Sequence, residues 1–196
     1  MRNRKVSGWG VLMFVVSLAM LALLFVPLRN PIGEPGRRNS CQSNLQQIVF
    51  GIRQYTADYD GKFPLISVSN APERYSPPYG WADAVMAYTK SSAIYQCPSE
   101  PFTPALTSNM SGFSDYWYNG NLSGLRKKAV AYPQSTLLLG EGSMDVDVAD
   151  ARYSKTSLPA AWLTDRTKPP WRHLGGANYL FTDGHVKWLK PNQVLH

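Results

Sequence analysis

The chain has 196 residues, which is enough for one domain of ordinary size with a hydrophobic core once an N-terminal segment is set aside. Its formal net charge is +7, but residues 1–38 hold six basic side chains and one acidic one, so most of the charge belongs to that flank. The rest of the chain has no concentrated basic patch, which argues against nucleic-acid binding, and 15 Gly with 15 Pro argue against a helical bundle.

Residues 6–28 contain no charged side chain. As a helix that rises about 1.5 Å per residue, this segment is roughly 34 Å long, enough to cross a hydrocarbon core of about 30 Å. A short basic tail, residues 1–5, precedes it, and the positive-inside rule places such a tail in the cytoplasm. We therefore predict a single transmembrane helix over residues 6–28 with an extracytoplasmic C-terminal domain. A cleaved signal peptide is the alternative, although its apolar run would be shorter, about 7–15 residues, and would end in small residues.

Proline and glycine recur in residues 29–39, which we interpret as a linker because proline costs about 3 kcal/mol inside a helix. The domain that follows, residues 40–196, is predicted to open with an amphipathic helix from Ser40, as the N-cap, to about Asp60. The helix holds only about three heptads, so its apolar stripe predicts packing on the domain rather than a coiled coil. The stripe of this first helix is formed by Cys41, Leu45, Ile48, Ile52, Tyr55 and Tyr59.

A second, shorter helix is predicted over residues 80–90.

Alternating and apolar runs predict strands in the second half of the chain. Residues 114–122 place Tyr116 and Tyr118 on one face and Trp117 on the other, and residues 136–139 form a short apolar strand. We expect these strands to belong to one antiparallel sheet that packs against the amphipathic helix. The predicted fold class of the domain is therefore α+β.

Two further apolar runs, residues 179–181 and 186–189, flank Asp183 and Gly184. An Asp-Gly pair between such runs indicates a β-hairpin, here over residues 179–189. We expect a type I′ turn, in which both central residues have positive φ.

Four sequence blocks carry a resemblance to a known family. Together they resemble the prepilin-type, processing-associated H-X9-DG domain family of pilin- and pseudopilin-like bacterial envelope proteins. Stretches between the blocks, at about residues 65–79, 101–113 and 143–170, are expected to be surface loops. The blocks are Cys41-x-x-Asn44-Leu45 continuing to Gly61-Lys62-Phe63-Pro64, Tyr95-x-Cys97-Pro98-Ser99-Glu100, Pro133 to Gly142, and His173-x9-Asp183-Gly184.

The resemblance implies a pilin-like head and a non-enzymatic role in secretion or surface assembly at the bacterial inner (cytoplasmic) membrane. It implies envelope or secretion-system proteins as partners, a role compatible with homo-oligomers, and no cofactor. Prepilins carry a Glu early in the mature helix, but no acidic residue precedes Glu34 here. That difference favours an alternative, a membrane-tethered envelope module that binds glycan or protein without polymerising. An envelope hydrolase that uses Glu141 or Asp183 is a further alternative.

The only two cysteines, Cys41 and Cys97, predict one disulfide in an exported domain. It would close a loop of about 56 residues, worth roughly 4 kcal/mol in the chain-entropy treatment. Two free buried thiols are the alternative. A zinc site is less favoured, because the spacing is long and no Cys-x-x-Cys occurs.

The motif residues His173, Asp183 and Gly184 are interpreted structurally: Asp183 and Gly184 form the turn and His173 orders the loop before the hairpin. A metal or catalytic site that adds His185 is the alternative, but a hairpin does not by itself bring His173 to His185. We predict no catalytic residue and no metal site, because the common nucleophile and metalloprotease motifs are missing and Glu141 is a lone carboxylate. Three acidic residues are interpreted as a solvated loop, with calcium as the alternative although the EF-hand pattern is missing: Asp145, Asp147 and Asp150.

Overall fold

The computed structural model describes residues 8–24, 33–68, 79–100, 107–143 and 149–194. The chain divides into two compact units, residues 1–32 and 33–196. The described part of the first unit is the apolar helix α1 (Gly8–Leu24), of 17 residues. Within the described ranges, no helix is both long and apolar enough to cross a membrane. The predicted span over residues 6–28 begins and ends outside those ranges.

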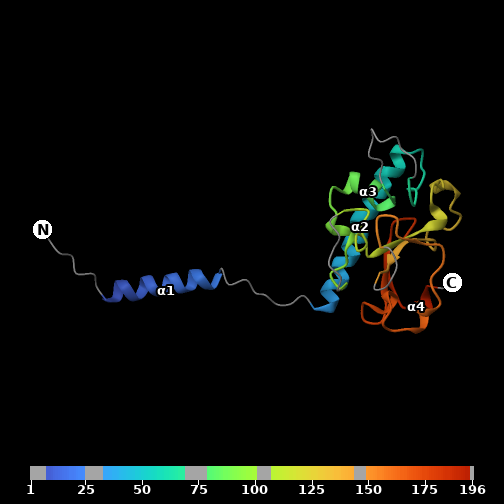
Figure 1. The fold of residues 1–196 in the computed structure, drawn as a ribbon. Coiled ribbons are helices and arrows are strands. Elements are labelled where there is room, and N and C mark those ends of the chain that lie inside the picture. The colour runs from blue at the N-terminus through green and yellow to red at the C-terminus, as the bar shows by residue number, and fades with distance from the viewer. Residues whose placement is uncertain (1–7, 25–32, 69–78, 101–106, 144–148, 195–196) are drawn as a thin grey trace. The chain divides into compact units, whose positions relative to one another are not determined.

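The second unit, which we call the head, is an α+β domain with one sheet (Figure 1). Its strands lie in the order β3-β1-β2-β4-β5. Neighbouring strands are antiparallel, except that β3 pairs with β1 in parallel. After β2 the chain crosses over β1 and adds β3 at the edge of the sheet. The prediction of a purely antiparallel sheet was therefore wrong at this edge. The elements of the head are α2 (Glu34–Asp58), α3 (Trp81–Thr89), β1 (Tyr116–Asn119), β2 (Leu137–Glu141), β3 (Ser154–Lys155), α4 (Ala161–Thr164), β4 (Ala177–Phe181) and β5 (Val186–Leu189).

Helix α2 packs along one face of the sheet (Figure 1) and supplies much of the main core. The predicted stripe is buried from Cys41 to Tyr55, whereas Tyr59, one residue beyond the helix, is half exposed. Because side chains alternate along a strand, Tyr116 and Tyr118 of β1 join this core while Trp117 points to the opposite face. The predicted alternation of β1 is confirmed.

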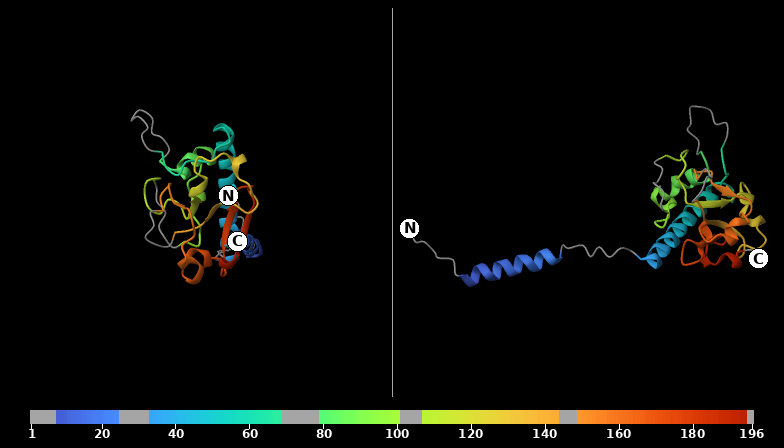
Figure 2. Two further views of the ribbon diagram at one scale, coloured as in Figure 1. Left: turned by 90° about the vertical axis from the view of Figure 1, so that its right-hand side faces the viewer. Right: turned by 60° about the horizontal axis from the view of Figure 1, so that its bottom comes forward.

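The second face of the sheet is covered by α4 and the segments around it (Figure 2). Trp162 of α4, with Ala149 and Tyr153, packs there against Trp117 and Tyr179 of the sheet. These three residues belong to the stretch that we expected to be a surface loop. Its described part instead completes a second core, because a sheet with apolar residues on both faces needs cover on both.

The N-cap of helix α2 lies seven residues before the predicted one, at Gly33 instead of Ser40. Gly33 is the N-cap and Pro35 lies in the first turn, where the missing N–H of proline has no partner to lose. Ser40 does not cap the helix; its hydroxyl donates to the Gly36 carbonyl inside it. Pro35 therefore marks the start of the helix, and the prediction that it lies in a linker was wrong.

The β4–β5 hairpin is confirmed, but its turn differs from the prediction. Only Gly184 has positive φ, at 98°, and its N–H donates to the Phe181 carbonyl. The Phe181 N–H in turn donates to His185. This pattern fits a three-residue connection in which a left-handed residue follows a tight turn. Arg53 of α2 donates to the Asp183 carbonyl, which ties the turn to the helix.

Gly140 of β2 lies against the indole of Trp117, since a Cβ at this position would stand 2.5 Å from Trp117 Cζ2. We predict that Gly140→Ala lowers the free energy of unfolding by about 1–3 kcal/mol, because the ring must leave its rotamer to make room. Urea unfolding followed by tryptophan fluorescence measures the change. Gly10→Ala, on α1 with open space around its Cβ, is the matched control and should leave the head unchanged. An equal stability of Gly140→Ala and wild type would contradict the packing described.

Candidate functional site

The two cysteines form the predicted disulfide. Cys41 of α2 and Cys97, in the loop before β1, have Cα atoms 5.2 Å apart, and both are buried. The bond joins residues 56 apart in sequence and ties the second turn of α2 to the loop before β1.

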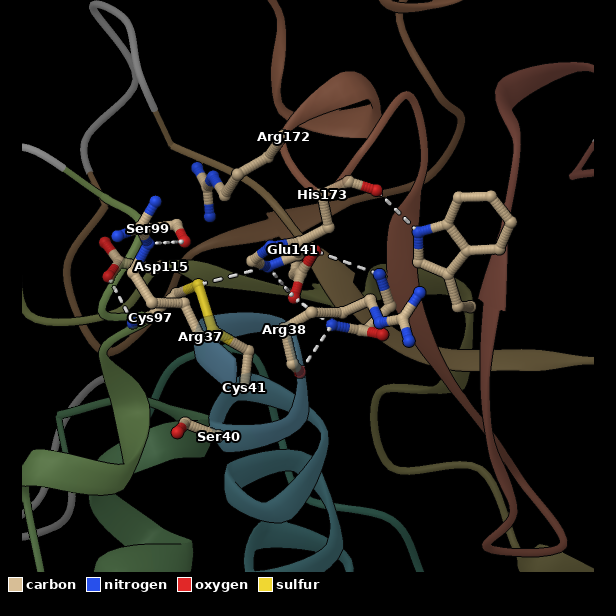
Figure 3. A network of polar contacts seen from close by, with 12 residues as sticks. Arg37, Arg38, Ser40, Cys41, Cys97, Ser99, Asp115, Glu141, Arg172 and His173 are labelled. Carbon is tan, nitrogen blue, oxygen red and sulfur yellow. Dashed lines mark hydrogen bonds and ion pairs between the residues drawn. A yellow bond between two sulfur atoms is a disulfide. The ribbon is translucent and has the colours of Figure 1, made fainter. Parts of the chain in front are cut away.

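The ring of His173 lies directly beside this disulfide (Figure 3). Its Nε2 is 3.4 Å from Cys97 Sγ and 3.0 Å from Glu141 Oε1, and its Nδ1 contacts a carboxylate oxygen of Glu34. His173 and Glu141 are fully buried. The first turn of α2, the end of β2 and the loop before β4 therefore meet at one histidine ring.

A ring that faces a carboxylate through each nitrogen satisfies both when it carries two protons. Burial lowers the pKa of His173, but the contacts with Glu141 and Glu34 outweigh it and leave the pKa raised. For Glu34 the effects are opposite in sign: burial raises its pKa, but the contacts with His173, Arg37 and Ser99 outweigh burial and leave the pKa lowered. Both shifts favour a charged ring beside a charged carboxylate.

Glu141 is fixed by Asn178 of β4 from its other side. The Asn178 backbone N–H donates to Glu141 Oε2 at 2.9 Å, and its side-chain amide donates to Oε1 at 2.7 Å. The same amide donates to the Arg38 carbonyl of α2 at 3.3 Å. The orientation of the buried carboxylate is thus set by the neighbouring strand.

A second buried charged group adjoins the disulfide loop. Arg172 pairs with Glu100 and donates to the Gly142 carbonyl at 2.6 Å, while its Nε and Nη1 have no hydrogen-bond partner in the described part of the chain. Asp115 accepts from the Cys97 backbone N–H at 2.7 Å. Burial raises the pKa of Asp115 to about 7, against the opposing effects of that hydrogen bond and of Arg172.

An open cavity of about 430 Å³ reaches this region from outside. Its wall includes Cys97, Glu100 and Asp115 together with Ser40 and Asn44 of α2. The buried cluster therefore adjoins a solvent-accessible recess through Cys97, which lines the cavity and contacts His173. Chemically, it brings together two sulfurs, an imidazole and several carboxylates.

The structure separates the motif residues that the sequence grouped. His173 is buried in the cluster, whereas Asp183 and His185 pair with each other at the hairpin turn, 2.7 Å apart and partly exposed. Asp183 also accepts the His185 backbone N–H, so it shapes the turn as predicted. His173 does more than order a loop, because its ring connects three elements.

The acidic loop is described only in part, since Asp145 and Asp147 lie outside the described residues. Asp150 is buried, forms an ion pair with Arg152 at 2.8 Å and accepts from the Tyr79 hydroxyl. The expectation of a solvated residue was wrong for Asp150, because these two partners cover it.

Sequence reasoning missed most of the partners around His173. Glu34 was counted only as a charge of the flank and Glu141 as a lone carboxylate, and Asn178 was not singled out. The contact between Glu34 and His173 spans 139 residues, and no local pattern reports such a pairing. The one available signal was Glu34 in the first turn of a helix, where acidic residues are favoured.

The raised pKa of Asp115 predicts a pH dependence of stability. The folded state binds this proton more tightly than the unfolded state, so its contribution is fully present below about 3.8 and is lost as the pH rises through about 7. We expect Asp115→Asn, which keeps an acceptor for Cys97, to flatten the fall in stability between about pH 4 and pH 7. Urea unfolding of the oxidised full chain across this range is the measurement.

Asp183→Asn is the matched control, because the pKa of Asp183 is lowered and the sign reverses. Its contribution is present above the pKa of the unfolded chain and is lost as the pH falls through the folded pKa. Identical pH profiles for Asp115→Asn and wild type would contradict the burial described for Asp115.

Comparison with known proteins gives a match to a family. The sequence model of a family described as "Protein of unknown function (DUF1559)" matches residues 33–137, from the N-cap of α2 to the first residue of β2. No curated protein and no solved structure matches the chain. The match covers more than half of the chain and includes Glu34, both cysteines and Asp115. The chain therefore belongs to the DUF1559 family, a family of bacterial envelope proteins with pilin-like features.

Proposed function

We propose that this protein is a non-enzymatic, membrane-anchored, pilin- or pseudopilin-like subunit that serves secretion or surface assembly. Residues 6–28 would form its single membrane span, and the head would lie outside the bacterial inner membrane. The observation that carries the proposal is the architecture of the head. The long helix α2 packs along a sheet of four antiparallel strands with one parallel edge strand. The family match and the H-x9-DG spacing of His173 and Asp183 support it.

The disulfide supports an exported head. Disulfides persist in oxidising compartments outside the cytoplasm and are rare in reducing ones. The basic tail before the uncharged segment supports the same orientation through the positive-inside rule.

The surroundings of the candidate carboxylates favour assembly over hydrolysis. Glu141 is fully buried with both oxygens bound, to Asn178 and to His173. Asp183 is engaged in its turn by His185. Glu141 is therefore not presented to a substrate, as general acid–base catalysis requires, and the partly exposed Asp183 has its turn role as its observed engagement.

A tethered module that binds envelope glycan or protein without polymerising is the second candidate. The specific observation in its favour is the N-terminal sequence, which has no acidic residue before Glu34 and has prolines at positions 27 and 31. Filament-forming prepilins use an acidic residue near the start of the mature helix, so this chain would have to assemble in another way.

We predict that the full chain expressed in a bacterium sediments with the inner membrane and is released by detergent but not by salt. Val16→Arg, in the middle of the uncharged segment, should reduce membrane insertion, because an arginine there costs about 2.5–3.5 kcal/mol. Thr107→Ser, a mild exposed change in the head, is the control. Recovery of the wild-type chain in the soluble cytoplasmic fraction, or substrate turnover by the purified protein, would defeat the proposal.

Mass determination of the mature N-terminus separates the two candidates. A start within residues 7–11, or an N-methylated first residue, supports prepilin processing and assembly. An intact Met1 or Arg2 supports the tethered module.

A further inference from the structure

His173 and three buried side chains around it offer metal-ligating atoms that lie close together. The Sγ atoms of Cys41 and Cys97, Nε2 of His173 and a carboxylate oxygen of Glu141 all lie within 4.8 Å of one another. In the present structure the two sulfurs are bonded to each other. We propose that, when this disulfide is reduced, the four residues bind a zinc ion, so that the site alternates between a disulfide and a metal centre.

The donor set suits zinc. Two thiolates, one imidazole and one carboxylate make a tetrahedral set of the kind that zinc accepts, with ligand distances of about 2.0–2.3 Å. Such an ion places its ligand atoms roughly 3.2–3.8 Å apart. The present distances from His173 Nε2, 3.0 Å to Glu141 and 3.4 Å to Cys97 Sγ, are already close to that range. The sulfurs must separate once their bond is broken, which rotation of the cysteine side chains permits.

The groups behind the ligands are already in place. Metal-binding histidines usually give their other ring nitrogen to a carboxylate, and here Nδ1 of His173 contacts Glu34, which points Nε2 at the sulfurs. Glu141 is held in turn by the backbone and side-chain N–H groups of Asn178. A histidine and a carboxylate that are oriented from behind in this way form half of a metal site before the metal arrives.

Cys97 is buried but lines the cavity of about 430 Å³ together with Asp115, so this wall is the side from which a reductant and an ion would approach the site. The long sequence spacing of the cysteines argued against zinc, but the fold answers this objection. It brings together ligands from α2, the loop before β1, the end of β2 and the loop before β4.

The chemistry balances with a dithiol as the reductant. The dithiol passes two electrons and two protons to the disulfide and becomes a disulfide itself, leaving Cys41 and Cys97 as thiols. Zinc binding then releases the two thiol protons and the Nε2 proton of His173, while Glu141 binds as the carboxylate. Oxidation by a disulfide partner reverses the sequence and expels the ion.

The test uses the full chain in detergent, reduced with a phosphine and transferred to anaerobic buffer. We expect one equivalent of Co²⁺ to bind, with sulfur-to-cobalt charge-transfer absorption and the strong d–d bands of a tetrahedral site, and one equivalent of Zn²⁺ to displace it. The oxidised chain should give no bands. Circular dichroism follows the fold throughout. If reduction unfolds the chain, we expect added zinc to refold it.

Variants assign the ligands. Cys41→Ser with Cys97→Ser should abolish the charge-transfer bands, and Glu34→Gln should weaken zinc binding by about 10- to 100-fold, as loss of an outer partner does. His185→Gln, at the exposed histidine of the β4–β5 turn, is the matched control and should bind like wild type. Failure of the reduced wild-type chain to take up stoichiometric Co²⁺ or Zn²⁺, whether it stays folded or fails to refold with metal, would overturn the proposal. So would cobalt bands that survive in the double cysteine variant.

Discussion

The ion-pair contacts of one buried histidine join three elements of the head. His173 touches Glu34 in the first turn of α2 and Glu141 at the end of β2, and it reaches both from the loop that leads into β4. Removing one partner from a buried charged group is costly, because the remaining charge is left without compensation. The register of α2 on the sheet is therefore tied to this contact as well as to the apolar core, and the disulfide beside it closes the same junction covalently.

Much of the fold was predictable because its signals are local. The apolar stripe from Cys41 to Tyr55, the alternation around Trp117 and the hairpin at Gly184 each report on contacts that repeat within a few residues. The start of α2 and the turn type were wrong because Pro35 and the Asp-Gly pair each fit two local structures, and only the packing around them decides which one forms. The parallel pairing of β3 depends on a crossover past β1 that no short pattern encodes.

The candidate site could be predicted only in part. Cys41 and Cys97 were paired correctly because they are the only two cysteines, and His173 was singled out by its spacing from Asp183. Their convergence with Glu141 and Glu34 joins four segments far apart in the sequence, so it depends on the whole fold. The alternative that grouped His173 with His185 does not match the structure, because His173 lies in the buried cluster whereas His185 pairs with Asp183 at the turn.

The edges of the sheet set a limit on how copies of the head can join. Strand β3 has only two residues, and the opposite edge strand, β5, carries the exposed Lys187. Short or charged edge strands resist the addition of a strand from another molecule. Growth of an assembly by continuing the sheet from head to head is therefore disfavoured. Subunits that do associate would have to meet through helices and loops, which leaves the sheet as a rigid frame inside each subunit.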